Sequence, residues 1–522
     1  MQATDPRRFW VLAACCTVAL AKLVDPKLWM MGLDIPATAF GAGWQGYRVF
    51  SAMSVLLMLV CMLFGGLLGD IFGRRRVLLL GALLSTVASA LTLFSTEIPW
   101  FVATRSVAVA AGAVAFPMTL AVIRLTFDGE ERPRALLIYS VVSAAGLLFA
   151  LLAIVIEWII GWRATLVLPL CVGTVGCYLA WRFVPESRAR ERVLRRAATA
   201  AAWTLTLLPL TLGLIAARLS GSWSNPVSIT AAAVGALGLV ALALAWRGRM
   251  RANMMDRISG RKRHLLSVML LTAATLSFGL TGYALQMYGY FSVVQGNGPL
   301  VAGLALLPML AAAVLTAKRA ARMALQIEPR RLIAGGLVLM GVAMILTALV
   351  RPGTPYWLLV GPLALFGFGY LVAQVAWTNT FISAMPDAVV GASAGIIKAT
   401  ALAGSTLGGV LLGTVLLIAG QVDFEQRLIA LGLSDVQVTA ATSALNALLI
   451  ADAAADRSMP PPSILESGLL ATYHEAYTVG VATALLIAAA ACLLMSGLAW
   501  LVLEPRNPAK LVAEDEELAE LI

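Results

Sequence analysis

Five charged residues lie inside long apolar stretches of this 522-residue sequence. They are Lys22, Asp25, Arg105, Glu157 and Lys398. A charge in apolar surroundings is costly, and it persists where it is paired or used. A carboxyl group there can bind and release a proton, whereas an ammonium or guanidinium group can hold an anion or a carboxylate. The residue types therefore indicate proton exchange and ion binding.

Asp25, Arg105 and Glu157 are candidates for proton coupling, and each has a structural alternative. Asp25 follows Lys22 by three residues, so both side chains can share one helical face. Asp25 is then either a proton site or half of a static ion pair. Arg105 either supports proton coupling or contributes to the packing of the bundle. Glu157 either relays protons or pairs with Arg163.

Lys22 and Lys398 are also candidates for substrate binding. Lys398 stands in the small-residue stretch GIIKATALAG. Its ammonium group could bind an anionic part of a substrate, or it could pair across a cavity with Asp25 or Glu157. Either role requires a fold in which long secondary-structure elements bring residues that are far apart in the sequence to the same buried region.

The composition identifies those elements as membrane-spanning helices. The chain is 60% hydrophobic and 12% charged. Its apolar runs are continuous, which favours helices because the backbone of a span must satisfy its own hydrogen bonds. A span needs about 20 apolar residues. We predict fourteen spans, at about 9–31, 48–69, 77–96, 99–125, 134–158, 162–183, 199–218, 226–246, 265–290, 299–317, 332–350, 355–380, 391–419 and 475–503.

The basic residues predict the orientation of these spans. With a cytoplasmic N-terminus, the cytoplasmic segments hold 28 of the 38 Lys and Arg residues. This asymmetry is typical of membrane proteins, whose cytoplasmic loops are positively charged. Both termini are therefore predicted to be cytoplasmic. The net charge of +11 needs no nucleic-acid partner to explain it.

The spans divide the chain into two six-helix bundles with an insertion between them. The predicted segments are an N-terminal bundle (1–183), a basic cytoplasmic connector (184–198), two inserted spans (199–246), a basic cytoplasmic loop (247–264), a C-terminal bundle (265–503) and a cytoplasmic tail (504–522). The second bundle contains a long loop, 420–474, on the opposite side of the membrane. That loop either caps the protein or binds an accessory partner.

A charged motif occupies the short loop between the second and third spans. Gly66, Asp70, Gly73, Arg74 and Arg75 fill the pattern G-x-x-x-D-x-x-G-R-R. The glycines allow close approach of backbones, and Asp70 can accept hydrogen bonds from the N-terminus of a neighbouring helix. We predict a conformational latch that forms in one state and breaks in another. The alternative is that the arginines only fix the topology.

This motif resembles the signature loop of the major facilitator superfamily. The fourteen-span count resembles the drug:proton antiporter branch of that family, in which two extra helices separate two six-helix bundles. Asp25 sits where the branch has an acidic residue in span 1, and Arg105 sits where the family has an arginine in span 4. Gly161-Trp162-Arg163 resembles the tryptophan-arginine pair that opens span 6.

The resemblance implies that spans 9 and 12 line a central cavity. Their polar and aromatic residues are Tyr283, Gln286, Tyr370, Gln374 and Trp377. Aromatic and amide side chains suit a large amphipathic ligand. For the neighbouring tyrosines near 288–290 the alternative is a belt at the membrane interface, whereas Tyr370 and Gln374 are expected to lie deeper.

We therefore expect a secondary transporter that works by alternating access and couples the export of amphipathic or hydrophobic compounds to protons. One alternative is a transporter of lipids or other anionic amphiphiles, which the intramembrane lysines would bind. Another is a non-transporting receptor or assembly partner that docks through 420–474. The expected partners are a small amphipathic substrate, protons and the lipid bilayer, and the chain is expected to be a monomer in a bacterial cytoplasmic membrane.

The sequence argues against an enzyme. It contains two histidines and no pattern typical of a metal cluster, a phosphate-binding loop or an activated nucleophile. The six cysteines all fall within predicted spans and behave as small apolar residues. We expect no cofactor and no metal.

Overall fold

The computed structural model describes residues 6–30, 44–127, 161–187, 260–384, 390–435 and 467–503, parts of 131–160, and residues 437–438. Every regular element in these residues is a helix, which confirms the all-α class. Eight of the described helices are long and apolar enough to cross a membrane, or nine if the bent pair within 300–324 is one span. The count of fourteen and the orientation of the termini stay predictions. The inserted spans (199–246) and the tail (504–522) lie outside the described residues.

The first half of the chain forms one group of packed helices. Within it α4 packs on α5, α1 on α8, and α3 on α5. The described helices are α1 (Pro6–Met30), α3 (Trp44–Phe72), α4 (Arg74–Leu93), α5 (Ile98–Thr126), α7 (Trp162–Thr165) and α8 (Val167–Phe183).

The second half forms another such group, in which α11 packs on α17, and α15 packs on both α16 and α19. Its described helices are α11 (Gly260–Gly289), the π-helical turn η1 (Tyr290–Val294), α12 (Pro299–Leu304), α13 (Leu307–Leu315), α14 (Ala317–Gln326), α15 (Pro329–Ala348), α16 (Tyr356–Ala384), α17 (Val390–Ala430) and α19 (Ser467–Val502). The glycine-rich run 404–409 of α17 lets this helix approach α11 closely. A Cβ added at Gly404 would lie 2.2 Å from a backbone oxygen of α11, and one at Gly408 would lie 2.3 Å from another. The run thus serves helix packing, as small residues do in membrane helices.

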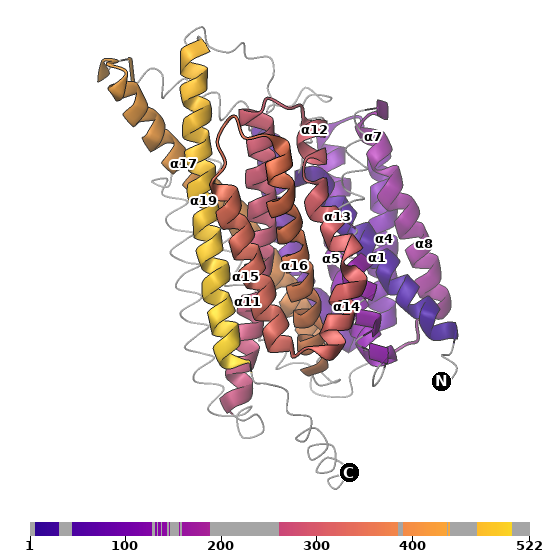
Figure 1. Cartoon of the computed structure of the whole chain (residues 1–522). Coiled ribbons are helices and arrows are strands. Elements are labelled where there is room, and N and C mark those ends of the chain that lie inside the picture. Colours follow the sequence, from indigo (N-terminus) through magenta and orange to yellow (C-terminus); the bar gives the residue numbers. More distant parts are fainter. Residues whose placement is uncertain are drawn as a thin grey trace.

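The two halves meet where α17 of the second half packs against α3 and α5 of the first. Figure 1 shows the two groups side by side, the first in indigo to magenta and the second in pink to yellow. We call the end of the molecule where α1 begins and α3 ends the proximal end. The other end, where α17 ends and α19 begins, is the distal end.

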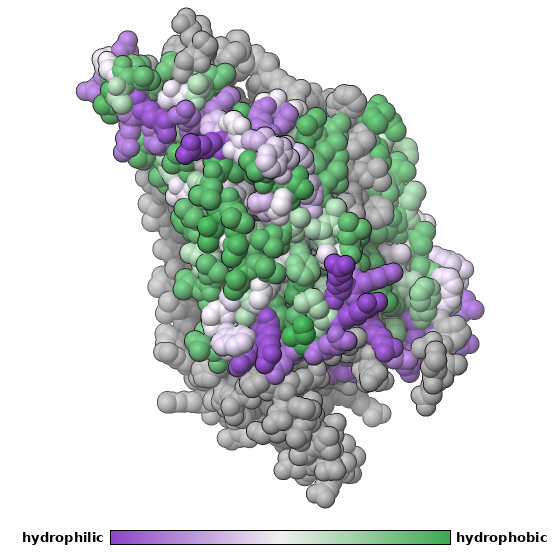
Figure 2. Space-filling model, viewed as in Figure 1, coloured by the Kyte–Doolittle hydropathy of each residue, from purple (hydrophilic) through white to green (hydrophobic). Residues whose placement is uncertain are grey.

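The surface that faces the viewer in Figure 2 carries a broad apolar zone, with hydrophilic side chains gathered toward the proximal and distal ends. Large apolar side chains are exposed on the described part of the chain, including Leu315 at 80% and Leu501 at 83%. A monomeric soluble protein rarely exposes a continuous apolar area of this kind. The pattern fits a protein whose sides face lipid.

Helices α17 and α19 extend further than the hydropathy of their sequences predicts. The apolar runs end at 419 and begin at 475, whereas the helices end at Ala430 and begin at Ser467. The 41 residues of α17 correspond to about 60 Å of helix, roughly twice the thickness of a bilayer core. Part of the predicted 420–474 loop is therefore helical, and residues 439–466 lie outside the described residues.

Candidate functional site

At the proximal end, Asp70 and Arg74 form a buried ion pair at the break between α3 and α4. Arg74 donates from Nη2 and Nε to Oδ1 of Asp70, at 2.8 and 3.1 Å. The two residues are only 3% and 2% exposed. Gly73 lies between the helices with φ +109°, a conformation that L side chains rarely adopt. The predicted motif thus builds a buried charged corner.

Two glycines of α17 bring the second half of the chain against this corner. A Cβ added at Gly391 would lie 2.4 Å from Oδ1 of Asp70 and 2.8 Å from the carbonyl oxygen of Gly66. A Cβ at Gly395 would lie 2.7 Å from the carbonyl oxygen of Met62. Asp70 is thereby beside the first described turn of α17. We call this contact between α3 and α17 the proximal junction.

Arg75, the last residue of the predicted latch, points elsewhere. Its Nη2 donates to the backbone oxygen of Trp181 at 2.6 Å, at the end of α8. The backbone N–H of Arg74 donates to the carbonyl oxygen of Ser187 at 2.9 Å. The loop is therefore attached both to the other half of the molecule and to the start of the chain segment that leaves α8.

Lys398 of α17 reaches into the first half between two aromatic rings. Its Nζ lies 4.4 Å from the ring centroid of Phe116 and 5.6 Å from that of Tyr139. Both distances fall within the range of cation–π attraction. The hydroxyl groups of Tyr139 and Thr119 are hydrogen-bonded at 2.9 Å.

Lys22 of α1 lies on the other side of the same region. Its Nζ donates to the hydroxyl of Ser85, which in turn donates to the carbonyl oxygen of Ala108 at 2.7 Å. Gly112 leaves room for this side chain, since a Cβ there would lie 2.4 Å from Nζ of Lys22. One small cavity beside Lys22 is also lined by Phe116. Phe116 thus lies under the ammonium group of Lys398 and lines the cavity beside Lys22.

Two of the predicted cavity residues hold the second half together. Tyr283 is fully buried, stacks on Phe366 with ring centroids 4.1 Å apart, and shares a hydrogen bond of 2.8 Å with Thr347. The indole of Trp377 donates to the backbone oxygen of Met269 at 2.7 Å. These contacts join α11, α15 and α16, which favours a structural role for both side chains.

The other three differ in accessibility. Gln286 is buried at 3% exposure, whereas Tyr370 and Gln374 of α16 are half-buried. Gln374 donates from Nε2 to the hydroxyl of Thr378 at 3.3 Å. Of the predicted cavity residues, Tyr370 and Gln374 are therefore the ones that a ligand could reach most readily.

The proton-coupling candidates are only partly described. Arg105 is fully buried within α5. Asp25 lies on α1, but its side chain is outside the described residues, and so is Glu157. Their role in coupling stays a prediction.

Phe116 and Tyr139 are the site residues that sequence reasoning missed. A signal was present for the first of them, because Phe116 is the one large ring in the small-residue stretch AVAAGAVAF. For Tyr139 no local pattern distinguishes it from other aromatic residues of predicted spans. Its significance depends on which residue of a distant helix lies over its ring.

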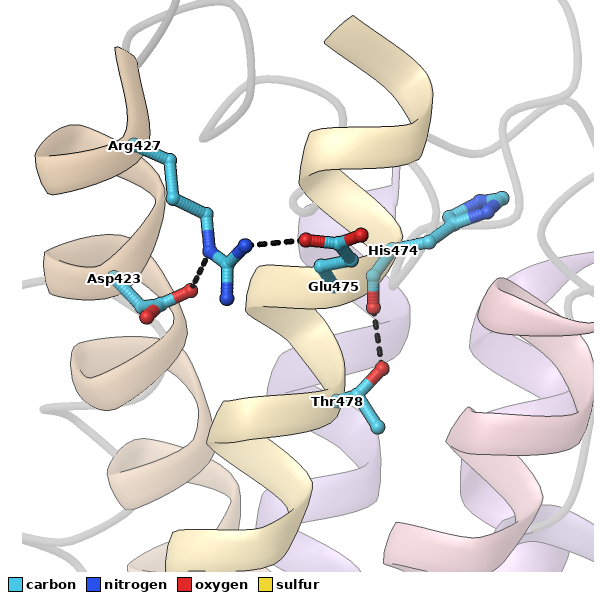
Figure 3. Close-up of polar contacts among 5 residues, drawn as sticks. All are labelled: Asp423, Arg427, His474, Glu475 and Thr478. Carbon is cyan, nitrogen blue, oxygen red and sulfur yellow. Dashed lines mark hydrogen bonds and ion pairs between the residues drawn. The ribbon is translucent and has the colours of Figure 1, made fainter. Parts of the chain in front are cut away.

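The distal end carries a second set of charges, shown in Figure 3. Arg427 of α17 pairs with Asp423 on its own helix and with Glu475 on α19. The ring of His474 points away from this pair, while its backbone oxygen accepts a hydrogen bond from Thr478. Beside these charges lies a small apolar cluster of Phe424, Leu428, Val438 and Ala476. We call this α17–α19 contact the distal hairpin.

Among the described side chains, no group of three or more His, Cys, Asp or Glu residues lies close enough together to hold a metal ion. Within the same residues the cysteines are free.

Comparison with known proteins places these features in context. The model of the Major Facilitator Superfamily matches residues 10–409. The multidrug efflux pump LfrA of Mycolicibacterium smegmatis is 26% identical over 492 residues, 93% of this chain and 94% of that pump. The methyl viologen resistance protein SmvA of Salmonella typhimurium is 29% identical over 416 residues, 78% of this chain and 83% of that protein. The crystal structure of the human organic anion transporter MFSD10 superimposes with a TM-score of 0.60 at 14% identity, covering 95% of this chain and 100% of that one.

Proposed function

This chain belongs to the Major Facilitator Superfamily and is a multi-pass transporter of that family, and we propose that it exports amphipathic or hydrophobic compounds in exchange for protons. In this proposal it has fourteen spans in a 6+2+6 arrangement with cytoplasmic termini. It resides in a bacterial cytoplasmic membrane, as the bacterial origin of its relatives suggests. Transporters of this family are generally carriers and not enzymes.

The observation that carries the proposal is the path of α17. This one helix of the second half touches Asp70 at the proximal junction and, further along, brings Lys398 to the rings of Phe116 and Tyr139. We call Lys398 and these two rings, with the neighbouring cavity beside Lys22, the interior site. A movement of α17 relative to α3 and α5 would therefore change both the proximal junction and the interior site. Such coupled movement is what alternating access requires. The names of relatives that match most of the chain, a multidrug efflux pump and a methyl viologen resistance protein, support export of xenobiotic compounds.

Within this scheme the proton-coupling candidates, two cavity residues and four latch residues have distinct roles. Asp25 carries the transported proton, Arg105 and Glu157 support its transfer, and Tyr370 and Gln374 contact the substrate. The latch of Gly66, Asp70, Gly73 and Arg74 closes the proximal end while the distal end is open.

An anionic amphiphile is the second candidate substrate. Two observations favour it: the Lys398 ammonium lies over the ring of Phe116, and Lys22 lines a small cavity together with Phe116. An ammonium group in apolar surroundings can hold an acidic head group.

Purified protein in liposomes that contain a pH-sensitive dye tests both candidates. Cationic, neutral and anionic amphiphiles are added in turn to wild type, Asp25→Asn, Lys398→Ala and the distal control Asp423→Asn. We expect proton flux on addition of cations, lost in Asp25→Asn and retained in Asp423→Asn. A response to anions alone, lost in Lys398→Ala, would replace the first substrate class by the second. Proton flux that persists in Asp25→Asn would remove Asp25 as the carrier.

A further inference from the structure

Lys398 occupies a place where an organic cation would bind. Its ammonium nitrogen is held over the faces of Phe116 and Tyr139, at 4.4 and 5.6 Å from the ring centroids. Aromatic faces carry partial negative charge and bind quaternary and delocalised cations in the same way. The two rings belong to the first half of the molecule, whereas the lysine belongs to the second.

Both rings are buried, at 5% exposure for Phe116 and 2% for Tyr139. The hydroxyl of Tyr139 is hydrogen-bonded to the buried Thr119 at 2.9 Å. Thr119 belongs to α5, as Phe116 does, and its hydroxyl donates to the backbone oxygen of Phe116 at 2.7 Å. The position of the Tyr139 ring is thus supported by a contact within the first half that does not involve Lys398.

The aromatic rings are the partners of this ammonium group in the described structure. No acidic side chain among the described residues forms an ion pair with Lys398. The nearby Lys22 differs, because its ammonium donates a hydrogen bond to Ser85. Among the described residues, a cation that approached the two rings would therefore compete with the ammonium group of Lys398.

We propose that Phe116 and Tyr139 bind the positively charged group of organic cations, and that Lys398 is a tethered competitor that fills this site when no substrate is bound. Lys398 is then a specificity-determining residue. It admits cations that bind the rings strongly enough to displace its ammonium group, and it excludes weakly binding ones. This inference rests on the proposed export of amphipathic compounds and adds the chemical basis of substrate choice.

The competition also links binding to movement. Because Lys398 lies seven residues after Gly391 on α17, displacement of its side chain acts on the helix that forms the proximal junction. When a cation binds the rings, the contact of Lys398 with Phe116 and Tyr139 is lost, which weakens the attachment of α17 to α5. The rings of the first half then hold the charge of the substrate and no longer that of a residue of the second half.

Equilibrium binding of tetraphenylphosphonium to the purified full-length protein in nanodiscs tests this proposal. The variants are Lys398→Met, which keeps the volume and removes the charge, and Lys398→Met combined with Phe116→Leu or with Tyr139→Leu. Lys318→Met, at an exposed position of α14, is the matched control. A melting curve for each variant identifies any that fails to fold. Tyr139→Phe, which keeps the ring and removes the hydroxyl, is the control for Tyr139→Leu. If Tyr139→Leu fails to fold, Phe116→Leu tests the loss of a ring.

We expect Lys398→Met to bind the cation at least about tenfold more tightly than wild type, a change of about 1.4 kcal/mol. The added Phe116→Leu or Tyr139→Leu should abolish this gain, Tyr139→Phe should keep it, and Lys318→Met should match wild type. Unchanged or weaker binding in Lys398→Met would overturn the proposal, as would a gain that survives in the variants that also lack the Phe116 or the Tyr139 ring.

The binding assay needs no proton gradient, which separates this inference from the proposed function. If Lys398→Met gains affinity but no variant transports cations in liposomes, proton-driven export is wrong and the competitor role stands. If wild type exports cations while Lys398→Met binds them as wild type does, the competitor role is wrong and export stands.

Discussion

Two aspartate–arginine pairs with identical spacing lie at opposite ends of the molecule, both in contact with α17. Asp70 and Arg74 are buried at the proximal junction, with side chains 4% and 3% exposed. Asp423 and Arg427 of the distal hairpin have side chains 23% and 37% exposed. Each pair joins residues i and i+4. The difference between them therefore lies in their surroundings and not in their chemistry.

The surroundings give the two pairs different consequences. The buried pair lies between the halves, where Gly391 and Gly395 let α17 approach α3 closely. The exposed pair joins α17 to α19, which belong to the same half. Breaking a buried pair leaves an uncompensated charge, whereas an exposed pair is screened by water and salt. We infer that the proximal pair controls movement between the halves and that the distal pair only steadies one of them.

Asp70→Asn should have the largest effect, because it leaves the buried guanidinium of Arg74 without its carboxylate. We expect a loss of about 3–5 kcal/mol in the free energy of unfolding. Titration with a denaturing detergent in mixed micelles measures it. The double variant Asp70→Asn/Arg74→Gln should recover part of this loss, because both charges are then removed. A double variant less stable than the single one would show that the two side chains do not act as a pair.

Gly391→Ala should come next, because its new Cβ would lie 2.4 Å from Oδ1 of Asp70. Overpacking of this kind costs about 1–3 kcal/mol. This energy destabilises the state in which the proximal junction is closed. Transport measured with the protein in liposomes should therefore fall by roughly tenfold for each 1.4 kcal/mol. Gly413→Ala on the same helix is the control, since a Cβ there meets nothing within 4 Å. Equal export by the two variants would contradict the close approach of α17 to α3.

Asp423→Asn should have the smallest effect, about 0–1 kcal/mol in the free energy of unfolding. High salt should reduce even that difference, because the Debye length falls to about 3 Å at 1 M. Export should match wild type. A loss as large as that of Asp70→Asn, or one that persists at high salt, would mean that the distal pair shares the role given to the proximal one.

The same comparison shows what could be predicted from the sequence. The proximal motif was predictable, because the spacing of Asp70, Gly73 and Arg74 alone places two opposite charges at a helix break. Hydropathy predicts most of the long helices in the described residues, because a continuous apolar run in the sequence is itself a local signal. It did not find the ends of α17 and α19, because the charged stretch QVDFEQRLIA leaves the apolar zone while its backbone continues as a helix. Hydropathy reports depth in the membrane and not the end of helical hydrogen bonding.

The interior site could be predicted only in part. The cost of charge in apolar surroundings singles out Lys22 and Lys398; Lys398 lies over the ring of Phe116, and Lys22 lines a cavity with that residue. The family resemblance and their residue types predict Tyr283 and Trp377 as cavity residues; the structure adds their hydrogen bonds to Thr347 and Met269 on other helices. Such pairings depend on contacts between helices far apart in sequence, which residue type and period do not specify.

Movement at the two ends of α17 can be measured directly with pairs of spin labels. One pair joins the exposed Phe72 of α3 to Lys318 of α14, across the two halves, and the other joins Ile429 to Leu470 across the distal hairpin. Distances between the labels are measured by double electron–electron resonance at several pH values, with and without an organic cation. We expect a second, longer distance for the first pair and one unchanged distance for the second. Separation of the distal pair, or a single fixed distance for both pairs under all conditions, would contradict a transport movement centred on the proximal junction.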